Sequence, residues 1–183
     1  MTKTKKHHRE VPTDLVKQAL HTSKARYVGE LSGGGPILLF QIPALRVQWV
    51  ARMTIDCDGS GGNPDDDPYY QSETSLCYRG KSLNAYKVPF IVVPPLVVGC
   101  CVPIVLGCQG MIVNLTLGLS TPAVVGDVGP SSKIGEASCE AAYRVGLSSN
   151  PNFGGTQEQE ILYMIWPGIA AVVDKIEYDL QAS

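Results

Sequence analysis

The feature that most constrains the fold is a stretch without any charged side chain over residues 88–126. Its first part, from Val88 to Cys108, is almost continuously apolar and is long enough to suggest a membrane-spanning helix. Prolines and glycines interrupt this part repeatedly, at Pro89, Pro94, Pro95, Gly99, Pro103 and Gly107. Because an interior proline removes a helical hydrogen bond, the stretch predicts short buried strands joined by tight turns, and no membrane span.

The composition agrees with a strand-rich domain. The 183 residues are 44% hydrophobic and only 17% charged, so the chain can bury a sizeable core. Its 19 glycines and 13 prolines, together with many Val and Ile residues, favour strands and turns over long helices. We therefore predict a mainly β protein, a compact β-barrel-like domain or a sandwich, with a few short helices.

Local patterns place the expected elements. Helices are predicted over residues 13–26, 135–145 and 169–180, with Gly146 as a C-terminal cap of the second. Strands are predicted over residues 37–41, 45–55, 69–78, 85–93, 96–100, 102–106, 110–117, 123–126 and 160–166. A long acidic loop is expected over residues 56–68.

Charge divides the chain into two parts. Residues 1–30 carry seven Lys/Arg and three Asp/Glu, whereas the remainder carries eight and fourteen. We expect a basic arm with a short helix and a glycine-rich linker over residues 1–35, followed by one main domain over residues 36–183. The net charge of −2 excludes a globally basic nucleic-acid binder, and the acidic body suits a cationic partner. No signal-peptide run follows the charged start, so we expect a chain that is either cytoplasmic as made or exported by a route that leaves no amino-terminal signal, and the compartment stays open.

The six cysteines give no metal motif. They are Cys57, Cys77, Cys100, Cys101, Cys108 and Cys139, and no pair has C-x-x-C spacing. A closed zinc site is therefore not expected. Reduced, buried thiols are the default, and one or two disulfides remain open if the protein works outside the cell.

Two aspartates open the acidic loop in Asp56-Cys57-Asp58-Gly59, and in extended chain they point the same way. A calcium loop would use residues at its first, third, fifth, sixth and twelfth positions, namely Asp56, Asp58, Ser60, Gly61 and Asp67. The eighth position is polar and the flanks look like strands, which argues against this interpretation. A solvated loop is the plainest alternative. We favour an acidic wall, formed by Asp56 and Asp58, beside a substrate cleft, and predict neither metal nor cofactor.

A second pair of acids lies on either side of a glycine-rich turn. The apolar strand Ala123–Gly126 delivers Asp127 at its end, and Glu136 follows nine residues later at the expected start of a helix. Two carboxyl groups on one rim are what acid/base cleavage of a glycosidic bond needs. The structural alternative is that Asp127 caps a turn and Glu136 stabilises a helix N-terminus.

Other catalytic schemes find little support. The chain contains neither a G-x-S-x-G elbow nor a phosphate-binding loop. All three histidines, His7, His8 and His21, lie in the basic arm. A Ser/His or Cys/His hydrolase would have to bring that arm into its site.

Five segments occur in one order along residues 53–168: MTIDCDG (53–59), DPYYQSETSL (67–76), LNAYKVPFIVVP (83–94), VGDVGPSSKIGEAS (125–138) and LYMIWPG (162–168). Together they resemble the chitosanases of glycoside hydrolase family 75. The resemblance implies inverting endo-hydrolysis of β-1,4-linked glucosamine polymer, with Asp127 and Glu136 as the catalytic carboxyls. Inversion requires these groups to stand about 6.5–9.5 Å apart, leaving room for a water molecule.

The resemblance also assigns sugar contacts. The acidic wall would bind the ammonium groups of the polymer. Aromatic rings would stack on sugars and polar groups would bond hydroxyls, at Tyr69, Tyr70, Gln71 and Thr74. The family pattern favours Glu136 as acid and Asp127 as base, whereas a helix start would lower the pKa of Glu136 and favour the reverse.

Two departures keep other functions open. Asn84 stands where the family often has an acidic residue, and residues 1–45 match no part of it. A peptidoglycan-directed glycan hydrolase of the lysin type and a catalytically silent carbohydrate-binding relative are the alternatives. In each case the partner is a polysaccharide, with neither nucleic acid nor membrane expected.

Overall fold

The computed structural model describes residues 25–41, 45–63, 65, 67, 69–99 and 104–181. Strands dominate these residues, and the helices are short. The strands are β1 Ala25–Glu30, β2 Pro36–Gln41, β3 Leu45–Asp56, β4 Cys77–Tyr78, β5 Lys81–Ser82, β6 Phe90–Val93, β7 Cys108–Asn114, β8 Leu119–Val128, β9 Glu136–Ser138, β10 Thr156–Ala170, β11 Val172–Val173 and β12 Ile176–Glu177. The helices are α2 Pro95–Val98 and α3 Cys139–Arg144.

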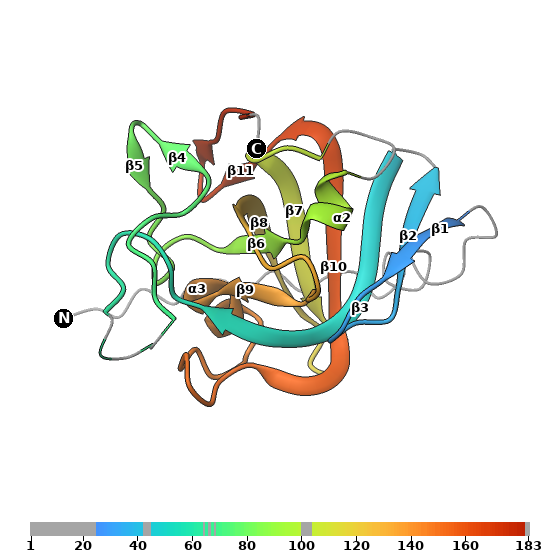
Figure 1. Ribbon diagram of the computed structural model, residues 1–183, viewed down its shortest axis with the longest axis horizontal. Helices are drawn as coiled ribbons and strands as arrows, with labels where there is room; N and C mark the ends of the chain where they lie inside the picture. Colours follow the sequence, from blue (N-terminus) through green and yellow to red (C-terminus); the bar gives the residue numbers. More distant parts are fainter. Residues whose placement is uncertain are drawn as a thin grey trace.

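Six strands close into a barrel (Figure 1). Hydrogen bonding runs in the order β3-β10-β7-β8-β6-β9, and a pairing of β9 with β3 completes the ring. The long strand β3 makes this closure possible, because its first residues pair with β2 and its last three, Thr54–Asp56, pair in parallel with β9. The strands β1 and β2 extend the sheet outside the ring. The prediction of a mainly β, barrel-like domain is confirmed.

The strand patterns explain the core. In β3, Val47, Trp49 and Ala51 are buried, and the residues between them are more exposed or polar. The ring of Trp49 stacks on that of Tyr163 from the neighbouring β10, with centroids 5.3 Å apart. All four residues of β6 are buried, as expected for a strand from the charge-free stretch.

The charge-free stretch forms several short elements, β6, α2, β7 and most of β8. One part of the prediction is wrong, because the strand expected over residues 96–100 gives way to the single helical turn α2. Pro95 occupies its first turn, where a proline costs no hydrogen bond and fixes a helical φ. Of the strand expected over residues 102–106, only Ile104–Leu106 is described, with an isolated bridge from Leu106 to Gln181. In the described part of the chain, no helix is long and apolar enough to cross a membrane.

Other expected elements are shorter or of another type. Residues 69–78 form a loop that ends in β4, and of residues 85–93 only the last four are a strand. The helix expected over residues 169–180 is wrong, because β10 continues to Ala170 and the small hairpin β11–β12 follows. The helix expected over residues 13–26 lies outside the described residues except for Ala25 and Arg26, which belong to β1.

The helix predicted over residues 135–145 begins later than expected. Glu136, Ala137 and Ser138 form β9, and α3 starts at Cys139. The Ser138 hydroxyl accepts a hydrogen bond from the Ala141 amide and caps the helix, so the N-cap comes three residues after the predicted start. Gly146, with φ of 82°, follows the C-terminal end as predicted.

Candidate active site

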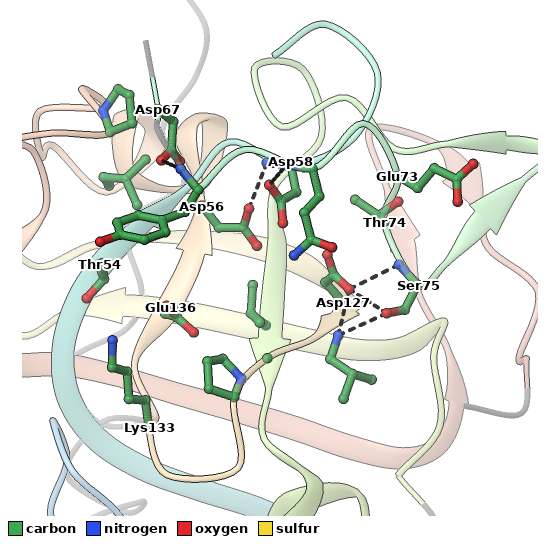
Figure 2. Close-up of a pocket in the computed structure, with 18 of the residues that line it drawn as sticks. Thr54, Asp56, Asp58, Asp67, Glu73, Thr74, Ser75, Asp127, Lys133 and Glu136 are labelled. Carbon is green, nitrogen blue, oxygen red and sulfur yellow. Dashed lines mark hydrogen bonds between the residues drawn. The ribbon is translucent and has the colours of Figure 1, made fainter. Parts of the chain in front are cut away.

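A pocket of about 780 Å³ opens where β3 and β8 end and β9 begins (Figure 2). Barrel strands supply one side of it and the loop that follows β3 supplies the other. Its lining residues are Thr54, Ile55, Asp56, Asp58, Asp67, Tyr69, Gln71, Glu73, Thr74, Ser75, Val92, Asp127, Val128, Gly129, Pro130, Lys133, Glu136, Pro151 and Asn152.

The two predicted catalytic carboxyls stand on either side of β6. Val92 of β6 pairs with Asp127 of β8 on one side and with Glu136 of β9 on the other. All three residues line the pocket, so their side chains point to the same face of the sheet. Two strand spacings separate the Cα atoms of Asp127 and Glu136 by about 10 Å. The site thus holds two carboxyl groups apart, with one small apolar residue between them.

Asp127 is fixed by donors that converge on one oxygen. Its Oδ1 accepts hydrogen bonds from the Ser75 amide at 3.0 Å, the Ser75 hydroxyl at 2.5 Å and the Val128 amide at 2.7 Å. The side chain is only 7% exposed. These three bonds hold the carboxyl group in one orientation in the lining of the pocket.

Glu136 has a different surrounding. Burial raises its pKa, and the nearby cations Lys133 and Arg52 oppose that rise. Because Glu136 lies in β9 and not at a helix start, the expectation of a pKa lowered by a helix terminus is wrong. A side chain at position 129 would come within 3.0 Å of Oε2, so Gly129 leaves the space that this carboxyl group occupies.

The acidic wall meets Asp127 across the pocket. One carboxylate oxygen from each of Asp56, Asp58 and Asp127 lies within 4.8 Å of the other two. Burial raises the pKa of Asp56 to about 8, and the neighbouring acids add to the rise. Burial also raises the pKa of Asp58. Crowded carboxyl groups of this kind favour a cationic ligand, which could be an ammonium group or a metal ion.

The calcium loop that the spacing suggested does not assemble. Its fifth position, Ser60, directs its hydroxyl to the carbonyl oxygens of Ser82 and Leu83. The third member of the acidic cluster comes from β8 and not from the loop. The loop is instead held by its own aspartates, since Asp58 accepts a hydrogen bond from the Gln71 amide and Asp56 accepts one from the Asp58 amide.

The predicted sugar contacts divide into two groups. Tyr69 and Gln71 line the pocket, and Tyr69 is 85% exposed, which leaves its ring available for stacking. Thr74 also lines it, but its hydroxyl donates to the Leu76 carbonyl oxygen and accepts from the Leu83 amide. Tyr70 lies outside the lining and donates its hydroxyl to the Gly59 carbonyl oxygen, so it supports the loop.

Sequence reasoning missed two residues of this site. Ser75 comes from the loop before β4, and Lys133 comes from the turn before β9. Both lie within segments that resemble family 75, which is the one signal that could have indicated them. Ser75 meets Asp127, and the charge of Lys133 acts on Glu136, only because the fold brings these distant segments together. The sequence pattern does not specify that arrangement.

A comparison with protein families matches residues 53–183, more than two thirds of the chain, to the fungal chitosanases of glycosyl hydrolase group 75. The protein is therefore a glycoside hydrolase of the chitosanase type, and its substrate is a polysaccharide. Within that class, the chain belongs to glycosyl hydrolase group 75. A search of curated proteins found no match.

Proposed function

We propose that the protein is an inverting endo-glycoside hydrolase that cleaves β-1,4-linked glucosamine polymer, with Asp127 and Glu136 as its catalytic carboxyls. The observation that carries this proposal is their pairing with Val92 from opposite sides in one pocket. Carboxyl groups on strands two spacings apart leave room for a sugar and a water molecule between them.

The surroundings of the two groups support a division of roles. Glu136, whose pKa is raised by burial, keeps a proton and donates it to the leaving glycosidic oxygen. Asp127, held by the donors on Oδ1, accepts a proton from water. That water attacks the anomeric carbon from the face opposite the leaving group, which inverts the configuration.

The acidic wall supports glucosamine as the repeating unit. A sugar with a free amine carries positive charge, and it would relieve the repulsion among Asp56, Asp58 and Asp127. An acetylated amine is neutral and offers no such gain. The exposed ring of Tyr69 at the pocket provides a surface for the apolar face of a sugar.

The test replaces each carboxyl group by the amide of the same shape. We expect Asp127→Asn and Glu136→Gln each to lower kcat on chitosan at least about 100-fold, as loss of a general acid or base does. Glu158→Gln, a similar change at an exposed position outside the pocket lining, serves as the control and should retain the rate. Wild-type rates in both pocket variants would overturn the proposal.

Product analysis tests the stereochemistry and the polymer. An inverting enzyme acting on β-linked chitosan releases the α-anomer first, which proton NMR detects before mutarotation. First appearance of the β-anomer would contradict inversion. Release of reducing ends from purified cell walls and none from chitosan would favour a peptidoglycan-directed enzyme, and binding of oligomers without any product would favour a silent relative.

A further inference from the structure

Two buried cysteines face each other beside the acidic wall. Asp56 of β3 pairs with Ser138 of β9 in parallel, so the next residues along each chain, Cys57 and Cys139, occupy facing positions. Their Sγ atoms are in contact at 2.6 Å, and each residue is only 1% exposed. Each cysteine directly follows a residue of the last β3–β9 pair, Asp56 and Ser138, whose Cα atoms lie about 4.8 Å apart as neighbours in a sheet. A disulfide needs Cα atoms about 4.4–6.8 Å apart, so the strand pairing brings the two cysteines to the distance that a bond requires.

We propose that Cys57 and Cys139 form a disulfide bond that ties the end of β3 to the start of α3. The bond would lie close to the residues of the candidate active site. Cys57 lies between the two aspartates of the acidic wall, and Cys139 follows Glu136 by three residues. A bond here holds the wall at a fixed place relative to β9. The bond itself is independent of the proposed function, which concerns only what the wall and Glu136 do.

The bond forms by thiol–disulfide exchange with a small-molecule disulfide such as oxidised glutathione. The thiolate of one cysteine attacks that disulfide and expels one thiol, and the second cysteine then attacks the mixed disulfide and expels the other. The two cysteines lose two protons and two electrons, and the small molecule is reduced to two thiols. Because both sulfur atoms are buried in the folded protein, this exchange takes place while the chain folds.

Peptide mapping tests the bond directly. Trypsin releases Cys57 and Cys77 together in residues 53–79 and Cys139 in residues 134–144, so the experiment uses the Cys77→Ser variant to leave one cysteine in the first peptide. The protein is refolded with oxidised and reduced glutathione, alkylated under denaturing conditions and digested without reductant. We expect one linked species that separates into the two peptides on reduction. Recovery of both peptides separately, each with an alkylated cysteine, would overturn the proposal.

Thermal unfolding supplies a second readout. Breaking a bond that closes a loop this long lowers the Tm by about 5–15 °C, so reductant should destabilise the Cys77→Ser protein by that amount. The further change Cys57→Ala with Cys139→Ala should abolish the response to reductant. A Cys108→Ala change, at another buried cysteine, should leave the response intact. An equal response in all of these variants would contradict the bond.

The same samples are assayed for sugar release from chitosan. A linked protein without sugar release would refute the proposed function and leave the disulfide standing. Sugar release from a protein whose two peptides are never linked would refute the disulfide and leave the function standing.

Discussion

At the scale of single residues, uncharged neighbours hold one oxygen of Asp127, the proposed catalytic base, in place by hydrogen bonds. Ser75 supplies two of the donors on Oδ1, through its amide and its hydroxyl. The hydroxyl also accepts a hydrogen bond from the Val128 amide, which links the loop to β8. If Asp127 is the proposed base, Ser75 acts through it, and we predict that Ser75 is a positioning residue.

Removal of the Ser75 hydroxyl tests this role. A hydrogen bond to a charged group contributes about 1.5–3 kcal/mol, so Ser75→Ala should lower kcat on chitosan about 10- to 100-fold and leave KM nearly unchanged. Ser75→Thr, which keeps a hydroxyl, should recover much of the rate. A rise in KM with kcat unchanged would show that Ser75 contacts the substrate in its ground state.

The raised pKa of Asp56 predicts a dependence of stability on pH. Its pKa of about 8 in the folded protein lies above the ordinary value of 3.8 for an aspartate, so the folded state binds the proton more tightly. Stability should therefore fall as pH rises from about 4 to about 8. Asp56→Asn should reduce this slope and raise the Tm at pH 8. Each pKa unit corresponds to about 1.4 kcal/mol, or about 3–6 °C in a domain of this size.

Thermal unfolding of wild type and Asp56→Asn at pH 4.5, 6 and 8 measures this slope. The exposed change Asp65→Asn is the matched control and should leave the slope as it is. Parallel curves for wild type and Asp56→Asn would contradict a buried, protonated Asp56.

At the scale of elements, the register of β9 against β3 sets the place of Glu136. Gly135 directly precedes β9, and its carbonyl oxygen accepts a hydrogen bond from the Thr54 amide at 2.8 Å. Its φ of 94° belongs to the left-handed region, and a Cβ there would meet the Arg52 carbonyl oxygen at 2.5 Å. Only glycine lets the chain pass β3 this closely.

Gly135→Ala should therefore displace β9 and lower both stability and activity. We expect a fall in Tm of about 5–10 °C, together with at least about a 10-fold loss of kcat, because strain and overlap combine. Gly118→Ala is the matched control, since its φ of 69° is similar but nothing lies within 4 Å of the added Cβ. It should cost about 2–4 °C and no activity. Equal effects of the two changes would mean that strain alone matters.

The elements also mark the limits of sequence analysis. Alternation of Leu45, Val47 and Trp49 with Arg46 and Gln48 predicted β3. The prediction held because one face of that strand, with Val47 and Trp49, is buried. The same logic failed at residues 169–180, where apolar residues follow each other without a helical N-cap and a bent β10 with a hairpin forms. At Glu136, three residues of parallel pairing decided between strand and helix, and that pairing joins segments far apart in the sequence.

At the scale of the whole molecule, residues that precede the matched family segment are hydrogen-bonded to the barrel. The Ser32 and Gly33 carbonyl oxygens accept hydrogen bonds from the Ile134 and Arg52 amides, and the Gly35 amide donates to Val50. These bonds join the glycine-rich segment to β3 and to the turn before β9. The boundary expected at residue 35/36 stays a prediction.

Truncation tests that boundary. A chain that begins at Pro36 loses these three hydrogen bonds, each worth about 0.5–1.5 kcal/mol, and also loses β1 as partner of β2. We expect its Tm to be about 5–10 °C below that of a chain that begins at Ala25. Equal melting temperatures would place the boundary of the stable domain at residue 36, where the sequence puts it.

The sequence and its family resemblance predicted Asp127 and Glu136 as the catalytic pair, which stays a prediction, but they did not indicate the distance between the two residues. A separation of nine residues in the sequence is compatible with many distances between the two carboxyl groups. In the structure, both residues pair with Val92, and this shared pairing fixes how far apart they stand. Burial of Asp56 and Glu136 likewise follows from barrel closure, which no local pattern contains. Composition was enough to predict a mainly β fold. The burial and the neighbours of each carboxyl group depend on tertiary contacts, which composition does not contain.

Barrel strands form one side of the pocket, and the loop that follows β3 forms the other. In the proposed function, bond cleavage is consequently assigned mainly to the paired strands and choice of polymer mainly to the loop. Sequence changes in the loop over residues 57–74 are then expected to alter which sugars are accepted, while Ser75 and the paired strands keep the reaction and its stereochemistry. An effort to redirect this enzyme to a new polysaccharide would therefore begin with that loop and leave β6, β8 and β9 as they are.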